Sequence, residues 1–159
     1  MGTILETTIN VFIDDSIHTF KMNNDLELSE LKKKIQAKTN IPAEEQELFK
    51  YGSQPLCLKS LQINSKTTLY LYKKNELFEI SVSCSDYDDT FDYTFLIHGN
   101  MTLDFIESMI LQKSKMELHK YKRFSLLFKV IILNNSKLVK DYDIKEGSLL
   151  IVKISHLKG

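Results

Sequence analysis

The residue types that carry most enzyme and metal chemistry are present in this chain, but they are not arranged for it. The four histidines are scattered, without the close spacing of metal ligands: His18, His98, His119 and His156. Cys57 and Cys84 stand alone, with no CxxC spacing and no histidine at a recognisable distance. We find no glycine-rich phosphate loop, no acid/base pair and no triad. The sequence therefore predicts no enzyme, no cofactor and no metal site.

Asp86, Asp88 and Asp89 form an acidic cluster that resembles a calcium loop only partly. The cluster lacks the glycine and the closing glutamate of an EF-hand loop. We therefore expect a solvated hairpin loop at this position. In a reducing compartment, the two cysteines are expected to behave as small apolar residues.

Charge and hydropathy exclude two further classes of protein. The 159 residues include 21 basic and 21 acidic side chains, and the balance holds in each half of the chain. An even charge disfavours an electrostatic grip on nucleic acid. No apolar run approaches the roughly 20 residues that span a bilayer, and no signal peptide is recognisable. We expect a cytoplasmic protein without nucleic-acid or membrane partners.

The hydrophobic pattern repeats once along the chain. Residues 8–13 and 17–22 alternate as a hairpin, and Leu28, Leu31 and Ile35 follow at helical spacing, with Asp25 or Ser29 as the candidate cap. Two further strands are expected at 46–51 and 67–72. The second half has the same order, with strands at 79–84, 91–97, 124–128, 130–133 and 148–154. Its helix carries Leu103, Ile106 and Ile110, and Thr102 is the candidate cap.

This repeat predicts an α+β protein made of two similar units. Each is a ββαββ-type mixed sheet with one helix packed across it. The predicted domains are residues 1–74 and 78–159, and residues 75–77 form a short linker. Each domain is small but within the size range that folds alone.

Both halves resemble ubiquitin. Residues 31–42 read LKKKIQAKTNIP, which is similar to the ubiquitin helix with its Lys-Ile-Gln core and Ile-Pro stop. Residues 141–150, DYDIKEGSLL, resemble the segment that enters the last ubiquitin strand. The resemblance covers about residues 8–73 and 78–159. It implies two tandem β-grasp domains, the architecture of the interferon-induced two-domain ubiquitin-like modifier and its bacterial antiphage-defence counterparts.

The tail aligns with the end of mature ubiquitin without a gap, so that Gly159 falls on the terminal glycine. Lys158 falls where the family has glycine. Two interpretations of this departure stay open, namely weaker cleavage by ordinary ubiquitin proteases and a dedicated set of partners. The resemblance implies conjugation through Gly159 to target proteins, with an activating (E1-like) enzyme, a conjugating (E2-like) enzyme and a deconjugating protease as partners. The alternatives are a non-covalent tandem adaptor and, ranked last, a sulfur carrier.

Strand alternation selects candidate protein-binding residues on the exposed face of each sheet. If Leu48, Leu69 and Leu71 point inward, then Phe49, Tyr70 and Tyr72 point outward. By register they occupy the position of ubiquitin's recognition patch, although they could instead pack between the two domains. In the second half Ile151 and Lys153 lie on the equivalent face, together with Leu127 or Phe128. We expect this second face to meet the activating or conjugating enzymes.

Overall fold

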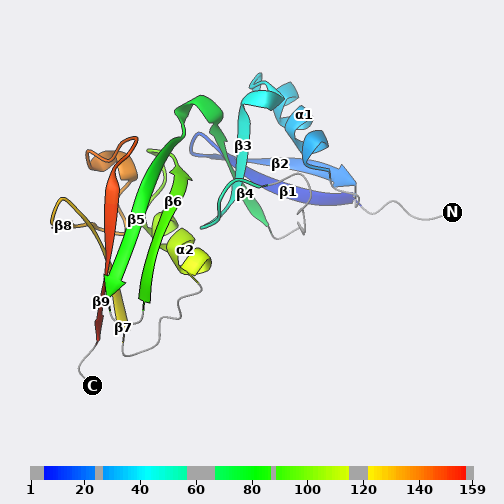
Figure 1. Cartoon of the computed structure of the whole chain (residues 1–159). Coiled ribbons are helices and arrows are strands. Elements are labelled where there is room, and N and C mark those ends of the chain that lie inside the picture. The colour runs from blue at the N-terminus through cyan, green and yellow to red at the C-terminus, as the bar shows by residue number, and fades with distance from the viewer. Residues whose placement is uncertain (1–5, 24–26, 57–66, 87–88, 115–121, 157–159) are drawn as a thin grey trace. The chain divides into compact units, whose positions relative to one another are not determined.

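The computed structural model describes residues 6–23, 27–56, 67–86, 89–114 and 122–156 (Figure 1). The chain divides into two compact units, Met1–Glu76 and Leu77–Gly159. We describe each unit by itself.

The first unit is a four-stranded mixed sheet with one helix. Its elements are β1 (Glu6–Ile13), β2 (Ser16–Asn23), α1 (Leu28–Thr39), β3 (Gln46–Lys50) and β4 (Thr68–Lys73). The strand order is β2-β1-β4-β3, in which β1 and β4 are parallel and the other pairs are antiparallel. Alternate residues of the strands point toward the helix. They pack against the apolar side of α1, formed by Leu28, Leu31 and Ile35, and together these side chains make the buried core of the unit.

The predicted end of the first helix is confirmed, whereas Ser29, one of its two candidate caps, is not the cap. Asn40 adopts a left-handed φ of 64° and closes α1 before the Ile-Pro stop. The N-cap position is Glu27, which makes no side-chain cap bond, and Ser29 lies inside the helix. Asp25 is outside the described residues.

Gln46 is fully buried, and its Nε2 donates to the carbonyls of Lys32 at 3.0 Å and Ile41 at 2.9 Å. These two hydrogen bonds connect β3 to α1 and to the segment that follows it.

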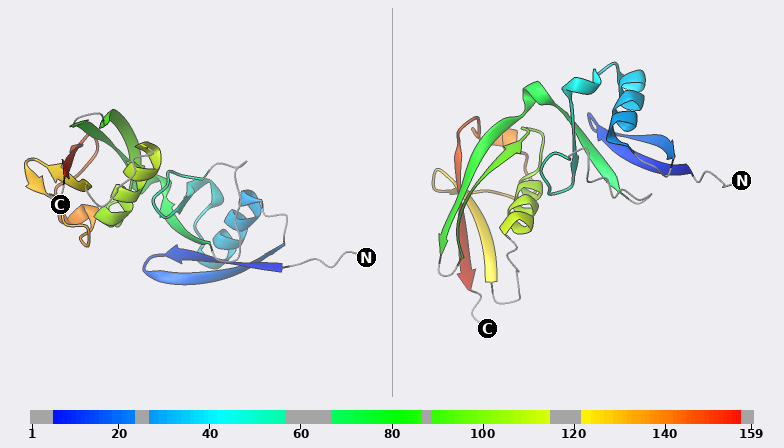
Figure 2. Two further views of the ribbon diagram at one scale, coloured as in Figure 1. Left: turned by 90° about the horizontal axis from the view of Figure 1, so that it is seen from below. Right: turned by 45° about the vertical axis from the view of Figure 1, so that its right-hand side comes forward.

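The second unit is a five-stranded mixed sheet with one helix (Figure 2). Its elements are β5 (Phe78–Asp86), β6 (Asp89–Ile97), α2 (Leu103–Ser114), β7 (Lys122–Phe128), β8 (Ile131–Ile132) and β9 (Leu149–His156). The order is β6-β5-β9-β7-β8, with β5 and β9 parallel. The predicted strand at 130–133 shortens to two residues at the edge, paired with the end of β7.

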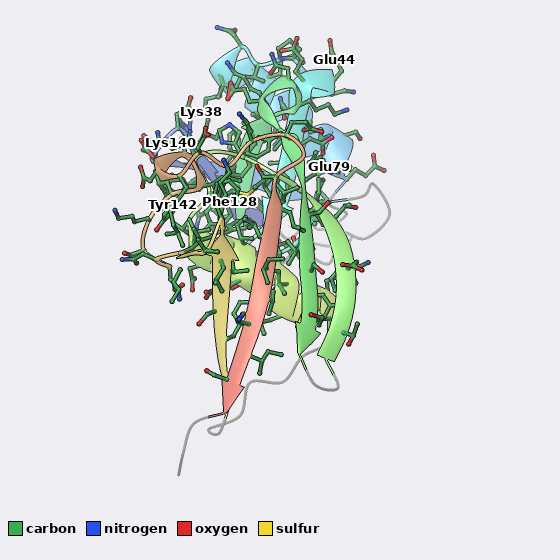
Figure 3. The ribbon with its side chains drawn as sticks, turned by 60° about the vertical axis from the view of Figure 1, so that its left-hand side comes forward. Lys38, Glu44, Glu79, Phe128, Lys140 and Tyr142 are labelled. Carbon is green, nitrogen blue, oxygen red and sulfur yellow. The ribbon has the colours of Figure 1, made fainter. Side chains whose placement is uncertain are left out.

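Local hydrogen bonds fix the ends of the elements in the second unit. The N–H of Phe105 donates to Thr102 Oγ1 at 3.1 Å, which confirms the predicted cap of α2. The Tyr142 hydroxyl, on the residue labelled in Figure 3, accepts the N–H of Asn134 at 2.9 Å and holds the loop after β8. Gly147 has φ of 82°, a left-handed angle that favours glycine, at the turn into β9.

The predicted fold class is confirmed, because each unit is a mixed sheet with one helix in the β-grasp order. Residues Lys74–Glu76 form a 3₁₀ turn near the predicted linker. The exact domain boundaries at 74 and 78 stay a prediction. Cys84 is buried, as expected for a small apolar residue, while Cys57 lies outside the described residues. No helix in the described part of the chain is long and apolar enough to cross a bilayer.

Candidate protein-binding faces

The outer face of the first sheet, opposite α1, carries a row of apolar side chains. In the strand register Ile17 lies opposite Phe12, Phe12 beside Tyr70, and Tyr70 opposite Phe49. The ring centroids of Phe12 and Tyr70 are 5.8 Å apart, and Tyr51 and Tyr70 are also 5.8 Å apart. We call Phe12, Tyr51, Tyr70 and Tyr72 the aromatic face. Partly exposed aromatic rings supply large contact area at low entropic cost, which suits protein recognition.

Phe49 lies on this side of the sheet as predicted, but the expectation that it is exposed is wrong. Its exposed fraction is 0%. The ring meets the edge of Tyr72 in a T-shaped contact at 5.4 Å, and the backbone bridges to Pro55, where the chain returns beside β3. A side chain without exposed surface cannot meet a partner in this conformation. Phe49 therefore supports the face from beneath.

Tyr72 is half-buried, and burial raises the pKa of its phenol above the ordinary value, with smaller contributions from Tyr70 and Tyr51. The hydroxyl therefore stays protonated throughout the physiological range. Beside Tyr72, Lys74 Nζ pairs with Glu47 Oε1 at 3.6 Å. Tyr72 thus places a neutral phenol next to this ion pair at one end of the aromatic face.

The sequence prediction missed three members of the outer row. Ile17 is 61% exposed and Tyr51 is 41% exposed, and Phe12 is half-buried beside Tyr70. The signal for Phe12 was present, because it lies between the inward residues Val11 and Ile13. Tyr51 follows the end of β3, so alternation alone could not have placed it.

The outer face of the second sheet carries an aliphatic row instead. Ile132 lies opposite Leu127, and Leu127 lies opposite Ile151. Leu149 is on the same side of β9 as Ile151, and these two are 49% and 36% exposed. We call Leu127, Val130, Ile132, Leu149 and Ile151 the aliphatic face. Large side chains exposed together in this way are typical of an interaction surface.

The predicted residues Ile151 and Lys153 both lie on the outer side of β9 and are exposed. Toward β5 and β6 the same side of the sheet becomes polar. Ser83 is the neighbour of Ile151 and lies opposite Asp92, while Ser81 lies opposite Thr94. The second outer face is thus apolar over β7 to β9 and hydroxyl-rich over β5 and β6.

A shallow groove of about 510 Å³ runs between the β7–β8 turn and the start of β9. Its apolar lining includes Phe128, Val130, Leu149 and Ile151, and its charged lining comprises Lys129, Lys145, Asp143 and Glu146. The Lys129 ammonium lies 5.2 Å from the centre of the Phe128 ring, which is labelled in Figure 3. A groove of this kind can hold an aliphatic side chain of a partner protein.

The turn that forms one wall of this groove is strained. Lys129 and Val130 have φ of 49° and 62°, the left-handed pair of a two-residue hairpin turn. Asn-Gly is the usual sequence there, and a β-branched residue with positive φ is an outlier. Val130 is also 93% exposed, so no burial offsets the strain. Strain of this kind concentrates at functional positions.

Glu107 on α2 is a half-buried carboxyl group. Burial, with a smaller contribution from the nearby Asp104 carboxylate, raises the pKa of Glu107 to about 7. The side chain therefore changes charge near neutral pH. In the described residues no group of three His, Cys, Asp or Glu side chains could hold a metal ion.

The predicted conjugation residues, Lys158 and Gly159, lie outside the described residues. β9 ends at His156, three positions before Gly159. The structure therefore bears on the tail only through the strand that leads to it.

Comparison with known proteins assigns the first unit. Residues 8–76 match the model of the family described as "Ubiquitin family". A chain from the solved structure described as "Molecular Mimicry of SUMO promotes DNA repair" is 17% identical with a TM-score of 0.43, and the match covers 49% of this chain and 91% of that chain. That similarity is too low to support an argument about function. The search of curated protein sequences gave no match. Residues 8–76 therefore form a ubiquitin-like domain.

Proposed function

We propose that this protein is a ubiquitin-like modifier that is activated at the Gly159 carboxylate and joined to amines of target proteins. The observation that carries the proposal is the ubiquitin-like domain at 8–76, followed by a second β-grasp unit whose last strand leads into the glycine-ended tail. Gly159 becomes the C-terminus either by translation or by cleavage behind it. The proposal also assigns the chain to the cytoplasm, where ATP and reduced thiols are available.

Conjugation proceeds through adenylation of the carboxylate, thioester formation and attack of an amine on the thioester. The Gly159 carboxylate attacks ATP and displaces pyrophosphate, which gives an acyl adenylate. A cysteine thiolate of the activating enzyme displaces AMP and forms a thioester, which passes to the conjugating enzyme. A lysine amine of the target then displaces the thiolate and forms an isopeptide bond. The modifier supplies only the carboxylate, because all catalytic groups belong to its enzymes.

The two outer faces divide the recognition work in this proposal. Ile151 and Lys153, which lie on the tail-bearing unit, meet the activating and conjugating enzymes, since these enzymes must hold the tail. The aromatic face of the first unit meets other partners, including the readers of the modified target. Lys158 in place of glycine restricts the tail to dedicated enzymes, because its side chain widens a segment that must enter a narrow channel. We include a role in antiphage defence in this proposal, because the tandem arrangement resembles that of the bacterial antiphage-defence modifiers.

Incubation with ATP and the cognate activating enzyme tests this proposal. A covalent adduct that a reducing agent removes is the expected product, and deletion of Gly159 abolishes it. The matched control is Lys158→Gly, which keeps the carboxylate and changes only the residue before it. If the unaltered chain gives no adduct while the same enzyme preparation still charges a control modifier, the proposal fails.

The aromatic face favours a second candidate function, a non-covalent tandem adaptor. In that case Tyr70→Ala together with Tyr72→Ala abolishes partner binding, while deletion of Gly159 leaves binding intact. Phe49→Ala is unsuitable for this test, because Phe49 is fully buried. Loss of partner binding on deletion of Gly159, with no loss in the tyrosine variant, rejects the adaptor.

A further inference from the structure

The two-residue turn between β7 and β8 holds an apolar side chain out in solvent. Val130 is 93% exposed, and its φ of 62° is one that a β-branched residue rarely adopts. Asparagine or glycine would fit this turn at lower cost. Valine here therefore destabilises the single chain, and burial against another molecule would offset that cost.

The turn forms one wall of the groove in the second unit, so a protrusion and a depression lie side by side. The facing wall, by which we mean the groove-lining residues from Asp143 to Leu149, has Leu149 as its apolar member. A surface that pairs with a second copy of itself across a two-fold axis must carry both parts of the contact. Each copy can then place its own turn in the groove of the other.

The charges of the two walls also suit a second copy of this surface. The turn carries one cation, Lys129, whereas the facing wall carries two carboxylates, Asp143 and Glu146, and one cation, Lys145. Glu146 Oε2 accepts the N–H of Glu79 at 2.7 Å, a neutral donor that leaves the formal charge unchanged. The groove as a whole is neutral and favours neither an acidic nor a basic partner, but its walls differ in sign. A turn from another copy brings a cation to the net negative wall.

The exposed apolar area around the groove has the size that a weak dimer needs. Five aliphatic side chains have exposed fractions of 93%, 55%, 68%, 49% and 36%, together equal to about three fully exposed side chains: Val130, Ile131, Ile132, Leu149 and Ile151. With the stem of Lys129, two copies could bury roughly 800–1,000 Å² in total. Stable complexes bury about 1,200–2,000 Å², so this contact belongs with transient ones.

We propose that two copies of this chain pair through this face across a two-fold axis. Val130 of each copy enters the groove of the other and packs against Leu149, and Lys129 of each copy faces Asp143 of the other. Both contacts form at once, so the pair is closed and grows no further. The formal net charge of the chain is zero, so no overall repulsion opposes the pairing.

Sedimentation equilibrium of the full chain tests this proposal. A contact of this area gives a dissociation constant on the order of 10–1000 µM. The weight-average mass should therefore rise with concentration and level off at the mass of a dimer. A constant monomer mass up to about 1 mM overturns the proposal and leaves the groove to a different protein. Growth past the dimer also overturns it, because a two-fold contact closes.

Val130→Asn tests the turn without harming it, because asparagine tolerates the positive φ while the apolar tip is lost. The substitution should raise the dissociation constant roughly tenfold or more, since it acts in both contacts of the pair. Ile17→Ser is the matched control, because Ile17 is 61% exposed but lies in the first unit, and this variant should associate normally. Equal effects of the two substitutions contradict the proposal. Circular dichroism confirms that each variant is folded before the comparison.

Charge reversal identifies the pairing most sharply. Lys129→Glu sets a carboxylate against Asp143 of the other copy, and Asp143→Lys sets a lysine against Lys129. Each variant alone should therefore have a dissociation constant raised roughly tenfold. In a mixed pair of the two variants both contacts again join opposite charges, so an equimolar mixture should recover the association of the unaltered chain. A mixture that associates no better than its components contradicts the proposal.

Discussion

Replacing Phe49 by alanine should damage the fold of the first unit rather than a binding surface. The ring is 0% exposed and packs against Tyr72 with a centroid distance of 5.4 Å. Phe→Ala substitutions at such sites cost about 3–5 kcal/mol, which includes the cavity left behind. That loss is a large part of the stability of a domain of this size.

Amide hydrogen exchange in the full chain measures this effect, because the slowest amides of a cooperative unit report its global unfolding. Val11 and Leu69, paired across the two central strands β1 and β4, provide suitable amides. Their exchange should accelerate roughly 10²–10⁴-fold in Phe49→Ala, since each 1.4 kcal/mol is tenfold. Phe49→Leu keeps most of the apolar volume and should cost only about 1 kcal/mol. Tyr51→Ala, at a partly exposed position, should cost at most about 1 kcal/mol.

A loss below about 1 kcal/mol in Phe49→Ala would refute the reasoning, because a fully buried ring cannot be removed so cheaply. If Phe49→Ala loses partner binding while its amide exchange rates stay unchanged, Phe49 contacts the partner directly. The comparison therefore decides between a supporting and a contacting role.

Three further substitutions test local features of the second unit. Glu107→Gln should raise the free energy of unfolding near pH 8. The pKa of the Glu107 carboxyl is about 7 in the folded chain, above its ordinary value of 4.5, so the protein loses stability as the pH rises from 4.5 through 7. Solvent screening of this half-buried group limits the gain to about 1 kcal/mol, which urea unfolding at pH 5 and pH 8 measures. An equal effect at both pH values would contradict this cause. Thr102→Ala removes the acceptor for the Phe105 N–H and should lower the free energy of unfolding by about 1 kcal/mol, as measured by thermal unfolding. The control Ser29→Ala, inside α1, should cost little. Equal losses in the two variants would show that the Thr102 cap is not stabilising. Val130→Gly removes the strain of a β-branched residue at φ of 62°. Glycine is more flexible in the unfolded chain, and after this cost the variant should still gain about 0.5–1 kcal/mol in thermal unfolding. A loss of stability would show that the turn is not strained.

The fold could be predicted from the sequence because its signals agree with one another. Leu28, Leu31 and Ile35 recur at helical spacing, the Ile-Pro stop follows, and alternating strands flank them, so local pattern and tertiary packing select the same structure. The cap of α1 could not be chosen between Asp25 and Ser29, because capping depends on where the helix starts, and helix ends are uncertain by one or two residues.

The candidate faces were only partly predictable. Alternation placed Phe49 on the outer side of the sheet, but it cannot show that Tyr72 and the returning chain at Pro55 cover it. For the aliphatic face, alternation selected Ile151 and left a choice between Leu127 and Phe128. Val130 and Leu149 could not be selected, because they join this face through a strained turn and through the pairing of β7 with β9, two strands far apart in the sequence. Both features depend on tertiary structure, which the local pattern does not encode.

The central claim is that Gly159 becomes bonded to lysines of other proteins. Affinity-tagged chain, purified under denaturing conditions from the cells that produce it and digested with trypsin, tests this directly by mass spectrometry. Trypsin cuts after Lys158, so a conjugate leaves a single glycine on the target lysine. Target peptides should carry such glycine-bearing lysines, and these should disappear when Gly159 is deleted. Recovery of the chain in its unmodified form only, or glycine-bearing lysines that persist after the deletion, would contradict it.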